Sequence, residues 1–145
     1  MTKDQIRLLL ASCVSGTSAG FQEPTEQEWQ ELRTRFGCDF PKELRHFVDL
    51  MSEFSFPGEI LNVGDGPNNG NDRIAFTYDF ERAENPAWNE DMIPFYAIGN
   101  GDYFCISRSE GPTSQVYYFY AERDSFEVYS PSVDAWIQQL PEFLG

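Results

Sequence analysis

Short apolar runs separated by turn residues fill the second half of the chain, and this pattern constrains the fold more than any other feature. The run 95–98 leads through Gly99-Asn100-Gly101-Asp102 into the run 103–107. An Asn-Gly pair between two apolar runs is typical of a β-hairpin, because both residues tolerate a positive φ. Two further runs, 116–120 and 126–129, follow at similar spacing. The sequence therefore predicts an antiparallel β-meander.

Helical signals surround this β-rich region. Thr25 and Glu28 have the spacing of a capping box, and Gly37 is placed to end the helix that they begin. The predicted helices cover 2–11, 25–36, 41–51 and a last segment that begins at Ser130 or Ser132. The residues with the 3.6-residue spacing of a buried helical stripe are Trp29, Leu32, Phe36, Leu44, Phe47, Val48, Met51, Val133, Trp136, Ile137 and Leu140.

One segment, 74–83, fits two structures. Ile74, Phe76, Tyr78 and Phe80 alternate with other residues, which favours a β-strand. Asp72 could equally cap a helix over the same stretch. Both interpretations stay open at this point.

The order of the elements defines the fold class. Helices come first, then the meander, then a final helix, which predicts an α+β fold. We expect an antiparallel β-sheet (meander) with N-terminal helices and a C-terminal helix packed on it, in a single domain over residues 1–145. A chain of 145 residues buries roughly 70% of its unfolded surface without disulfides or metals.

The charge is strongly negative and unevenly distributed. The chain has 24 acidic and 10 basic residues, for a net charge of −14. Residues 59–91 hold eight acids and two bases, and residues 110–145 hold six acids and one base. Solubility is one explanation, and steering of a basic protein partner is the other. The same sign of charge disfavours nucleic acid and anionic membranes as partners. The odd count of widely spaced cysteines indicates reduced thiols and a cytoplasmic location.

Catalytic and cofactor patterns are missing from the sequence. His46, the only histidine, lies off the apolar stripe of its helix, which favours a plain surface or edge residue. No Cys-x-x-Cys pair occurs, so no zinc site is expected. An EF-hand loop beginning at Asp65 would need oxygen ligands where Pro67 and Phe76 stand, although a looser oxygen site stays open. We expect no enzyme activity, no cofactor and no metal.

Several motifs resemble those of the SUKH superfamily. The stretch Ile93-Pro94-Phe95 followed by 98–106, with Gly101-Asp102 at its turn, resembles the central signature of that superfamily. The helix opening over 40–47, which reads Phe-Pro-x-Glu-Leu-Arg-x-Phe, is similar to the segment that precedes it. A late strand at 116–120 and a C-terminal Ser-Trp-Leu helix extend the resemblance over about residues 25–145.

The resemblance implies a function in protein binding. Many bacterial members of this superfamily are immunity proteins that bind and neutralise a cognate toxin domain, often a nuclease, and fungal members are cell-wall assembly regulators. An acidic domain could occupy the basic, phosphate-binding surface of such a nuclease. We therefore expect an immunity protein with a basic toxin as partner. The alternatives are a regulatory protein-interaction module and a small-molecule or metal-binding domain.

Candidate partner contacts come mainly from the first acidic block. The acidic residues and the aromatic residues expected to anchor a partner are Glu59, Asp65, Asp72, Asp79, Glu81, Trp88 and Tyr120. The turn Asn100-Gly101-Asp102 is expected to have a structural role.

Overall fold

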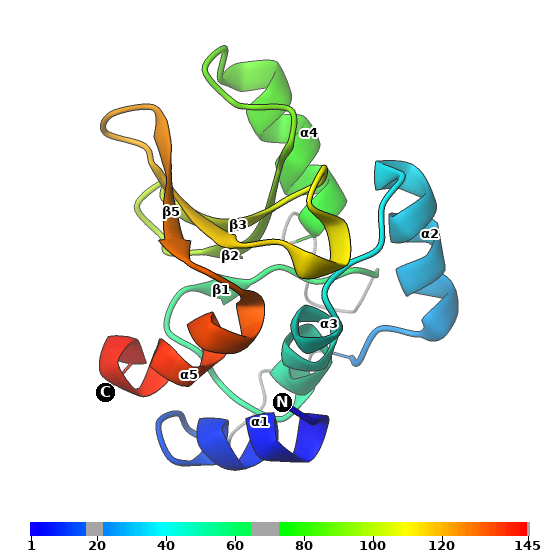
Figure 1. Cartoon of the computed structure of the whole chain (residues 1–145), viewed down its shortest axis with the longest axis vertical. Coiled ribbons are helices and arrows are strands. Elements are labelled where there is room, and N and C mark those ends of the chain that lie inside the picture. The colour runs from blue at the N-terminus through cyan, green and yellow to red at the C-terminus, as the bar shows by residue number, and fades with distance from the viewer. Residues whose placement is uncertain (17–21, 65–72, 145) are drawn as a thin grey trace.

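A computed structural model describes residues 1–16, 22–64 and 73–144, and Figure 1 gives its layout. Within these residues the α-helices are α1 (Lys3–Ala11), α2 (Glu26–Phe36), α3 (Lys42–Asp49), α4 (Ile74–Glu84) and α5 (Val133–Leu144). The strands are β1 (Glu59–Ile60), β2 (Met92–Ala97), β3 (Tyr103–Ser107), β4 (Val116–Tyr120) and β5 (Ser125–Ser130). Two short 3₁₀ turns cover Leu50–Ser52 and Gly111–Thr113.

The strands form one antiparallel sheet in the order β1-β2-β3-β4-β5. The predicted meander and the α+β fold class are therefore confirmed. The β2–β3 hairpin pairs Ala97 with Tyr103 across the predicted Asn-Gly turn. A bulge between Pro94 and Tyr96 interrupts this register, and the consecutive residues Phe95 and Tyr96 are both buried in the main core. An extra residue in one strand thus supplies two aromatic rings to one core.

The first three helices begin where the local signals indicated, and α1 and α2 also end there. Thr25 and Glu28 form a complete capping box at the start of α2, and Gly37 ends it with a φ of 67°. Thr2 forms a second capping box on α1, with Gln5 as its partner. Helix α3 begins directly after Pro41, and the buried Met51 lies in the following 3₁₀ turn instead of in the helix.

The segment that fits two structures is the helix α4. Ile74 and Tyr78, one turn apart, are buried, whereas Phe76 and Phe80, also one turn apart, are exposed. Residues two apart point to nearly opposite sides of a helix, so the alternating apolar residues are divided between the core and the surface. Tyr78 fixes the buried side, because its hydroxyl donates a 2.6 Å hydrogen bond to the carbonyl oxygen of Glu90.

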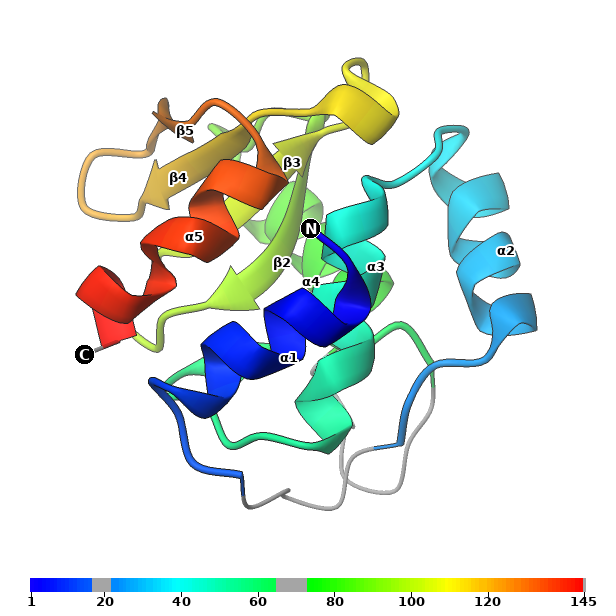
Figure 2. The ribbon, with the colours of Figure 1, turned by 60° about the horizontal axis from the view of Figure 1, so that its bottom comes forward.

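The core has two clusters of buried residues: the larger takes residues from all five α-helices of the described chain, and the smaller consists of Trp88, Met92, Cys105 and Phe119. Helices α1, α3 and α5 lie on one side of the sheet, and α4 lies on the other (Figure 1). The C-terminal helix contributes all four residues of its predicted stripe, Val133, Trp136, Ile137 and Leu140, to the main core. Ser132 accepts a hydrogen bond from the backbone N–H of Ala135 and so caps this helix. Helix α2 lies at the outer edge of the molecule beside α3 (Figure 2).

Candidate protein-binding surface

Two of the predicted acidic contacts come together beside α4. Glu59 lies on β1 and Glu81 on α4, and both carboxylates act electrostatically on the half-buried Tyr103 of β3. The Tyr103 hydroxyl donates a 2.8 Å hydrogen bond to Glu81. Burial, and then this hydrogen bond, raise the pKa of Tyr103, so its hydroxyl stays protonated at neutral pH. The hydrogen bond from Tyr103 therefore holds the Glu81 side chain at the edge of this surface.

A shallow groove lies beside these two carboxylates and is lined by Glu59 and by Tyr103, the partner of Glu81. It has a volume of about 230 Å³, and its apolar lining comes from Leu61, Phe76, Phe80 and Ala97. The Phe76 side chain is 37% exposed and that of Phe80 is 52% exposed. We define this site, with Glu59 and Tyr103 at its ends, as the α4 groove. The sequence interpretation missed the two phenylalanines as surface residues, although helical spacing within 74–83 was a signal for them.

Asp79 points away from the α4 groove. It forms an ion pair with Arg35 of α2, on the opposite side of α4 from Glu81. This contact ties α4 to α2 and neutralises the Asp79 charge. Asp65 and Asp72, the remaining acidic candidates, lie outside the described residues.

Trp88, which the sequence suggested as an aromatic anchor for a partner, is a core residue in the structure. Trp88 is only 3% exposed, and its indole N–H donates a 3.1 Å hydrogen bond to the carbonyl oxygen of Met92. Its ring packs edge-on against Tyr103 and Phe126. A bulky ring with its polar atom satisfied belongs in a core, and Trp88 closes the smaller core cluster on the α4 side of the sheet.

Tyr120 lies apart from the α4 groove. It is half-buried at the end of β4, with the Arg123 guanidinium 4.1 Å from its ring centroid. Its neighbour Phe119 packs on Trp88, so Tyr120 points to the other face of the sheet. The structure thus brings Glu59 and Glu81 together and leaves Tyr120 on a separate surface.

The turn of the β2–β3 hairpin is held by side chains. Gly99 and Gly101 have φ angles of 105° and 94°, a region that favours glycine. Asn100 Oδ1 accepts a 3.0 Å hydrogen bond from the backbone N–H of Asp102. Asp102 accepts further hydrogen bonds from the Tyr118 hydroxyl at 2.7 Å and from the N–H of Ala121 at 2.8 Å. The Asp102 carboxylate therefore connects this hairpin to the end of β4.

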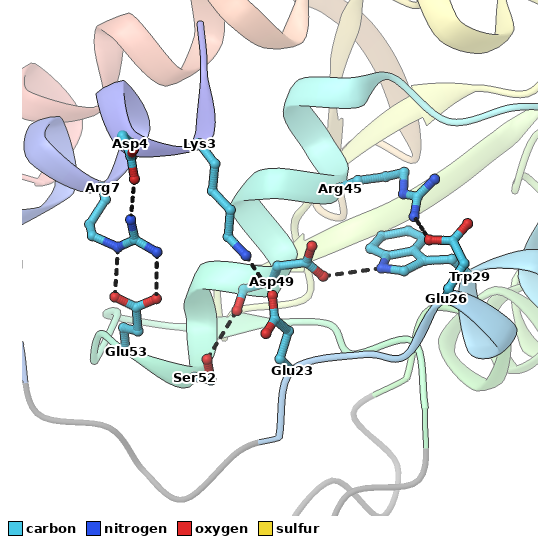
Figure 3. Close-up of polar contacts among 10 residues, drawn as sticks. All are labelled: Lys3, Asp4, Arg7, Glu23, Glu26, Trp29, Arg45, Asp49, Ser52 and Glu53. Atoms are coloured by element: carbon cyan, nitrogen blue, oxygen red, sulfur yellow. Dashed lines mark hydrogen bonds and ion pairs between the residues drawn. The ribbon is translucent and has the colours of Figure 1, made fainter.

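A second hollow is a cleft between α2 and α3, with a volume of about 600 Å³. We call it the α2–α3 cleft. Trp29 Nε1 donates a 3.1 Å hydrogen bond to Asp49 across it (Figure 3). Arg45 donates to Glu26 at 2.6 Å and lies 5.2 Å from the Trp29 ring centroid. These charges are paired within the chain, so the cleft joins α2 to α3.

Burial shifts the pKa of two ionisable groups that line this cleft. Burial lowers the pKa of His46 and raises the pKa of Asp49.

Burial also raises the pKa of all three cysteines, Cys13, Cys38 and Cys105, so these thiols stay protonated at neutral pH. In the described parts of the chain no three His, Cys, Asp or Glu side chains gather closely enough to bind a metal ion. Nor is any helix there both long and apolar enough to cross a membrane.

Comparison with known proteins identifies the family. The model of the family SUKH_5, described as SMI1-KNR4 cell-wall, matches residues 3–144. The chain therefore belongs to the SUKH superfamily, as the motifs at 40–47 and 93–106 indicated. A crystal structure of a protein from Pseudomonas syringae pv. tomato has a similar fold, with a TM-score of 0.67. It is 16% identical in sequence, and the match covers 94% of this chain and 96% of that one. No curated protein matches this chain significantly.

Proposed function

We propose that this protein is an immunity protein, which binds a cognate toxin domain and neutralises it without catalysis. The observation that carries the proposal is the α4 groove, where exposed phenylalanines lie between carboxylates. Exposed aromatic side chains are enriched at protein interfaces, and negative charge selects basic partners. Membership of the SUKH superfamily supports a protein partner.

Neutralisation would follow from occupying the toxin's basic surface. A nuclease needs Lys and Arg side chains to bind the phosphates of its substrate. Glu59 and Glu81 would pair with such cations, while Phe76 and Phe80 would contribute apolar contact. The cytoplasm, where thiols stay reduced, is the compartment in which we propose that it acts.

Growth rescue tests this function. The toxin-like C-terminal domain encoded beside this gene would be expressed alone and together with this protein. We expect growth to stop in the first case and to return in the second. Persistent toxicity, or a neighbour that does not impair growth, would contradict the immunity function.

The ionic strength dependence of binding tests the role of charge. The association rate with the partner should fall as salt rises, because the Debye length shortens from about 30 Å at 0.01 M to about 8 Å at 0.15 M. An association rate that does not change with salt would mean that the carboxylates do not steer the partner, even if the complex is tight.

The description of the matching family favours one alternative. That description names SMI1-KNR4 and the cell wall, and it fits a regulatory protein-interaction module better than it fits immunity. Such a module would bind its partner without any effect on toxicity. A pull-down from a strain without the toxin gene separates the two functions, because only the regulatory module retains a specific partner there.

A further inference from the structure

The α4 groove has two apolar walls that come from different parts of the chain. Phe76 and Phe80 lie one turn apart on α4, and Leu61 and Ala97 lie on the sheet side. Leu61 is held in place because its N–H donates a 2.9 Å hydrogen bond to the carbonyl oxygen of Phe95. One wall is therefore built on the sheet, and the other is an exposed helix face.

The size of the α4 groove limits what it can bind. Pockets for cofactors and other small molecules have volumes of about 300–1,000 Å³ and enclose most of the ligand. The α4 groove has a volume of only about 230 Å³ and lies open at the surface. It can receive one or two apolar side chains of a larger partner, and it is too small to enclose a cofactor.

The last turn of α4 gives the groove its charge. Glu84 is exposed and lies one turn beyond Phe80 on the same helix face, and Glu81 lies beside it. The only basic residue of this turn, Arg82, forms a 3.6 Å ion pair with Glu90. Negative charge at the C-terminal end of a helix is unfavourable, because that end already carries a partial negative charge. The carboxylates therefore do not stabilise α4, whereas a bound cation would.

We propose that the α4 groove binds a short basic, amphipathic segment of the partner protein. One bulky apolar side chain of that segment enters between the helix wall, Phe76 and Phe80, and the sheet wall, Leu61 and Ala97. Lys or Arg side chains next to it pair with Glu59, Glu81 and Glu84. This inference rests on the proposed function as a protein-binding domain, and it specifies the chemistry of the binding segment.

Labelled peptides test this chemistry directly. The first probe is a fluorescein-labelled peptide of about 14 residues, in which Leu and Phe at helical spacing form one face and Lys forms the other. In the second probe every Leu and Phe is replaced by Ser, and in the third every Lys is replaced by Glu. Fluorescence anisotropy with the full chain should detect binding of the first probe only. Equal binding of the first two probes would overturn the proposal, as would no binding of the first.

Variants locate the binding site. Phe80→Ser and Phe76→Ser should each weaken binding of the first probe by about tenfold or more, the effect of losing a central apolar contact. The matched control is Leu8→Ser on α1, since the Leu8 side chain is 74% exposed and far from α4 (Figure 1). Its affinity should equal that of the unchanged protein, and circular dichroism should be the same for all variants. An equal loss for Leu8→Ser and Phe80→Ser would contradict binding in the α4 groove.

Growth rescue with the same variants separates this inference from the proposed function. If the unchanged protein and Phe80→Ser rescue growth equally, the immunity function stands and the α4 groove is not its binding site. If the peptides bind as expected but no toxin is neutralised, the α4 groove is a binding site for basic segments and the proposed immunity function is wrong.

Discussion

The α2–α3 cleft and the α4 groove are both hollows in the surface, but their chemistry differs. The cleft is larger, about 600 Å³ against about 230 Å³. Side chains from its two helices bind each other, as in the hydrogen bond from Trp29 to Asp49 and the ion pair of Arg45 with Glu26. The groove instead exposes Phe76 and Phe80 to solvent between carboxylates. The cleft thus joins two helices, whereas the groove presents exposed aromatic side chains.

This difference shows that volume is a poor guide to a protein-binding site. A hollow lined by ion pairs would lose those pairs if a partner entered it, and desolvating them costs free energy. An exposed apolar pair loses only water contacts on binding, which is favourable at about 25 cal/mol per Å². The smaller hollow, the α4 groove, is therefore the better candidate for a protein-binding site.

The largest expected effect concerns stability and separates the two regions. Trp29→Ala removes a buried ring that contacts Phe40 and donates to Asp49. It should lower the free energy of unfolding by about 3–5 kcal/mol, as large-to-small core substitutions do. Phe80→Ala should change it by only about 0.5 kcal/mol, since exposed sites tolerate substitution. Urea unfolding measures both, and similar losses would mean that the two regions do not differ as described.

The second prediction concerns association with the partner. Glu59→Lys combined with Glu84→Lys should slow association at low salt by about tenfold, equivalent to about 1.4 kcal/mol. Arg45→Gln, the control in the cleft, should leave the association rate unchanged. Stopped-flow fluorescence at low and high salt makes the measurement. A larger effect from Arg45→Gln would move the binding site to the α2–α3 cleft.

The third prediction concerns the hydrogen bond at the end of the groove. Tyr103→Phe removes the donor to Glu81 and should lower the free energy of unfolding by about 1 kcal/mol at neutral pH. Because folding raises the pKa of Tyr103, this stability is present below the ordinary tyrosine pKa of about 10 and is lost as the pH rises further. The variant and the unchanged protein should therefore converge in strongly alkaline solution. A difference that does not depend on pH would exclude ionisation of Tyr103 as its cause.

The smallest expected effects are on stability, and they have opposite signs for Asp49 and Glu53, two of the carboxylates drawn in Figure 3. Burial raises the pKa of Asp49 above its ordinary value of 3.8, so stability falls as the pH rises through the folded-state pKa. Arg7 lowers the pKa of Glu53 below 4.5, so stability falls as the pH decreases through that pKa. At pH 7, Asp49→Asn should stabilise the protein and Glu53→Gln should destabilise it. Thermal unfolding at pH 7 and pH 4 checks both signs, and two shifts in the same direction would contradict this account.

Local signals in the sequence predicted much of the fold. Thr25, Glu28 and Gly37 specify the ends of α2 through hydrogen bonds and backbone angles within a few residues of each other. The Asn-Gly turn between β2 and β3 is equally local. The stripe of α5 predicted burial, because its spacing marks one face of a helix.

The candidate site was harder to predict, because it depends on contacts between distant segments. The sequence suggests Trp88 as an anchor for a partner, but Tyr103, Phe119 and Phe126 from three strands pack against its ring. The sequence suggests Asp79 as a partner contact, but in the folded chain it forms an ion pair with Arg35 of α2. Nothing within a few residues of Trp88 or Asp79 carries that information.

The sequence by itself determined the family, the meander, the helix ends and the negative charge, since each depends on composition or on neighbours along the chain. Only the tertiary structure decided that 74–84 is a helix, because the alternation of Ile74, Phe76, Tyr78 and Phe80 suits either a strand or a helix. Packing of Ile74 and Tyr78 into the core selected the helix. The same packing places Phe76 and Phe80 on the outer face of α4, beside Glu59 of strand β1, and so creates the α4 groove.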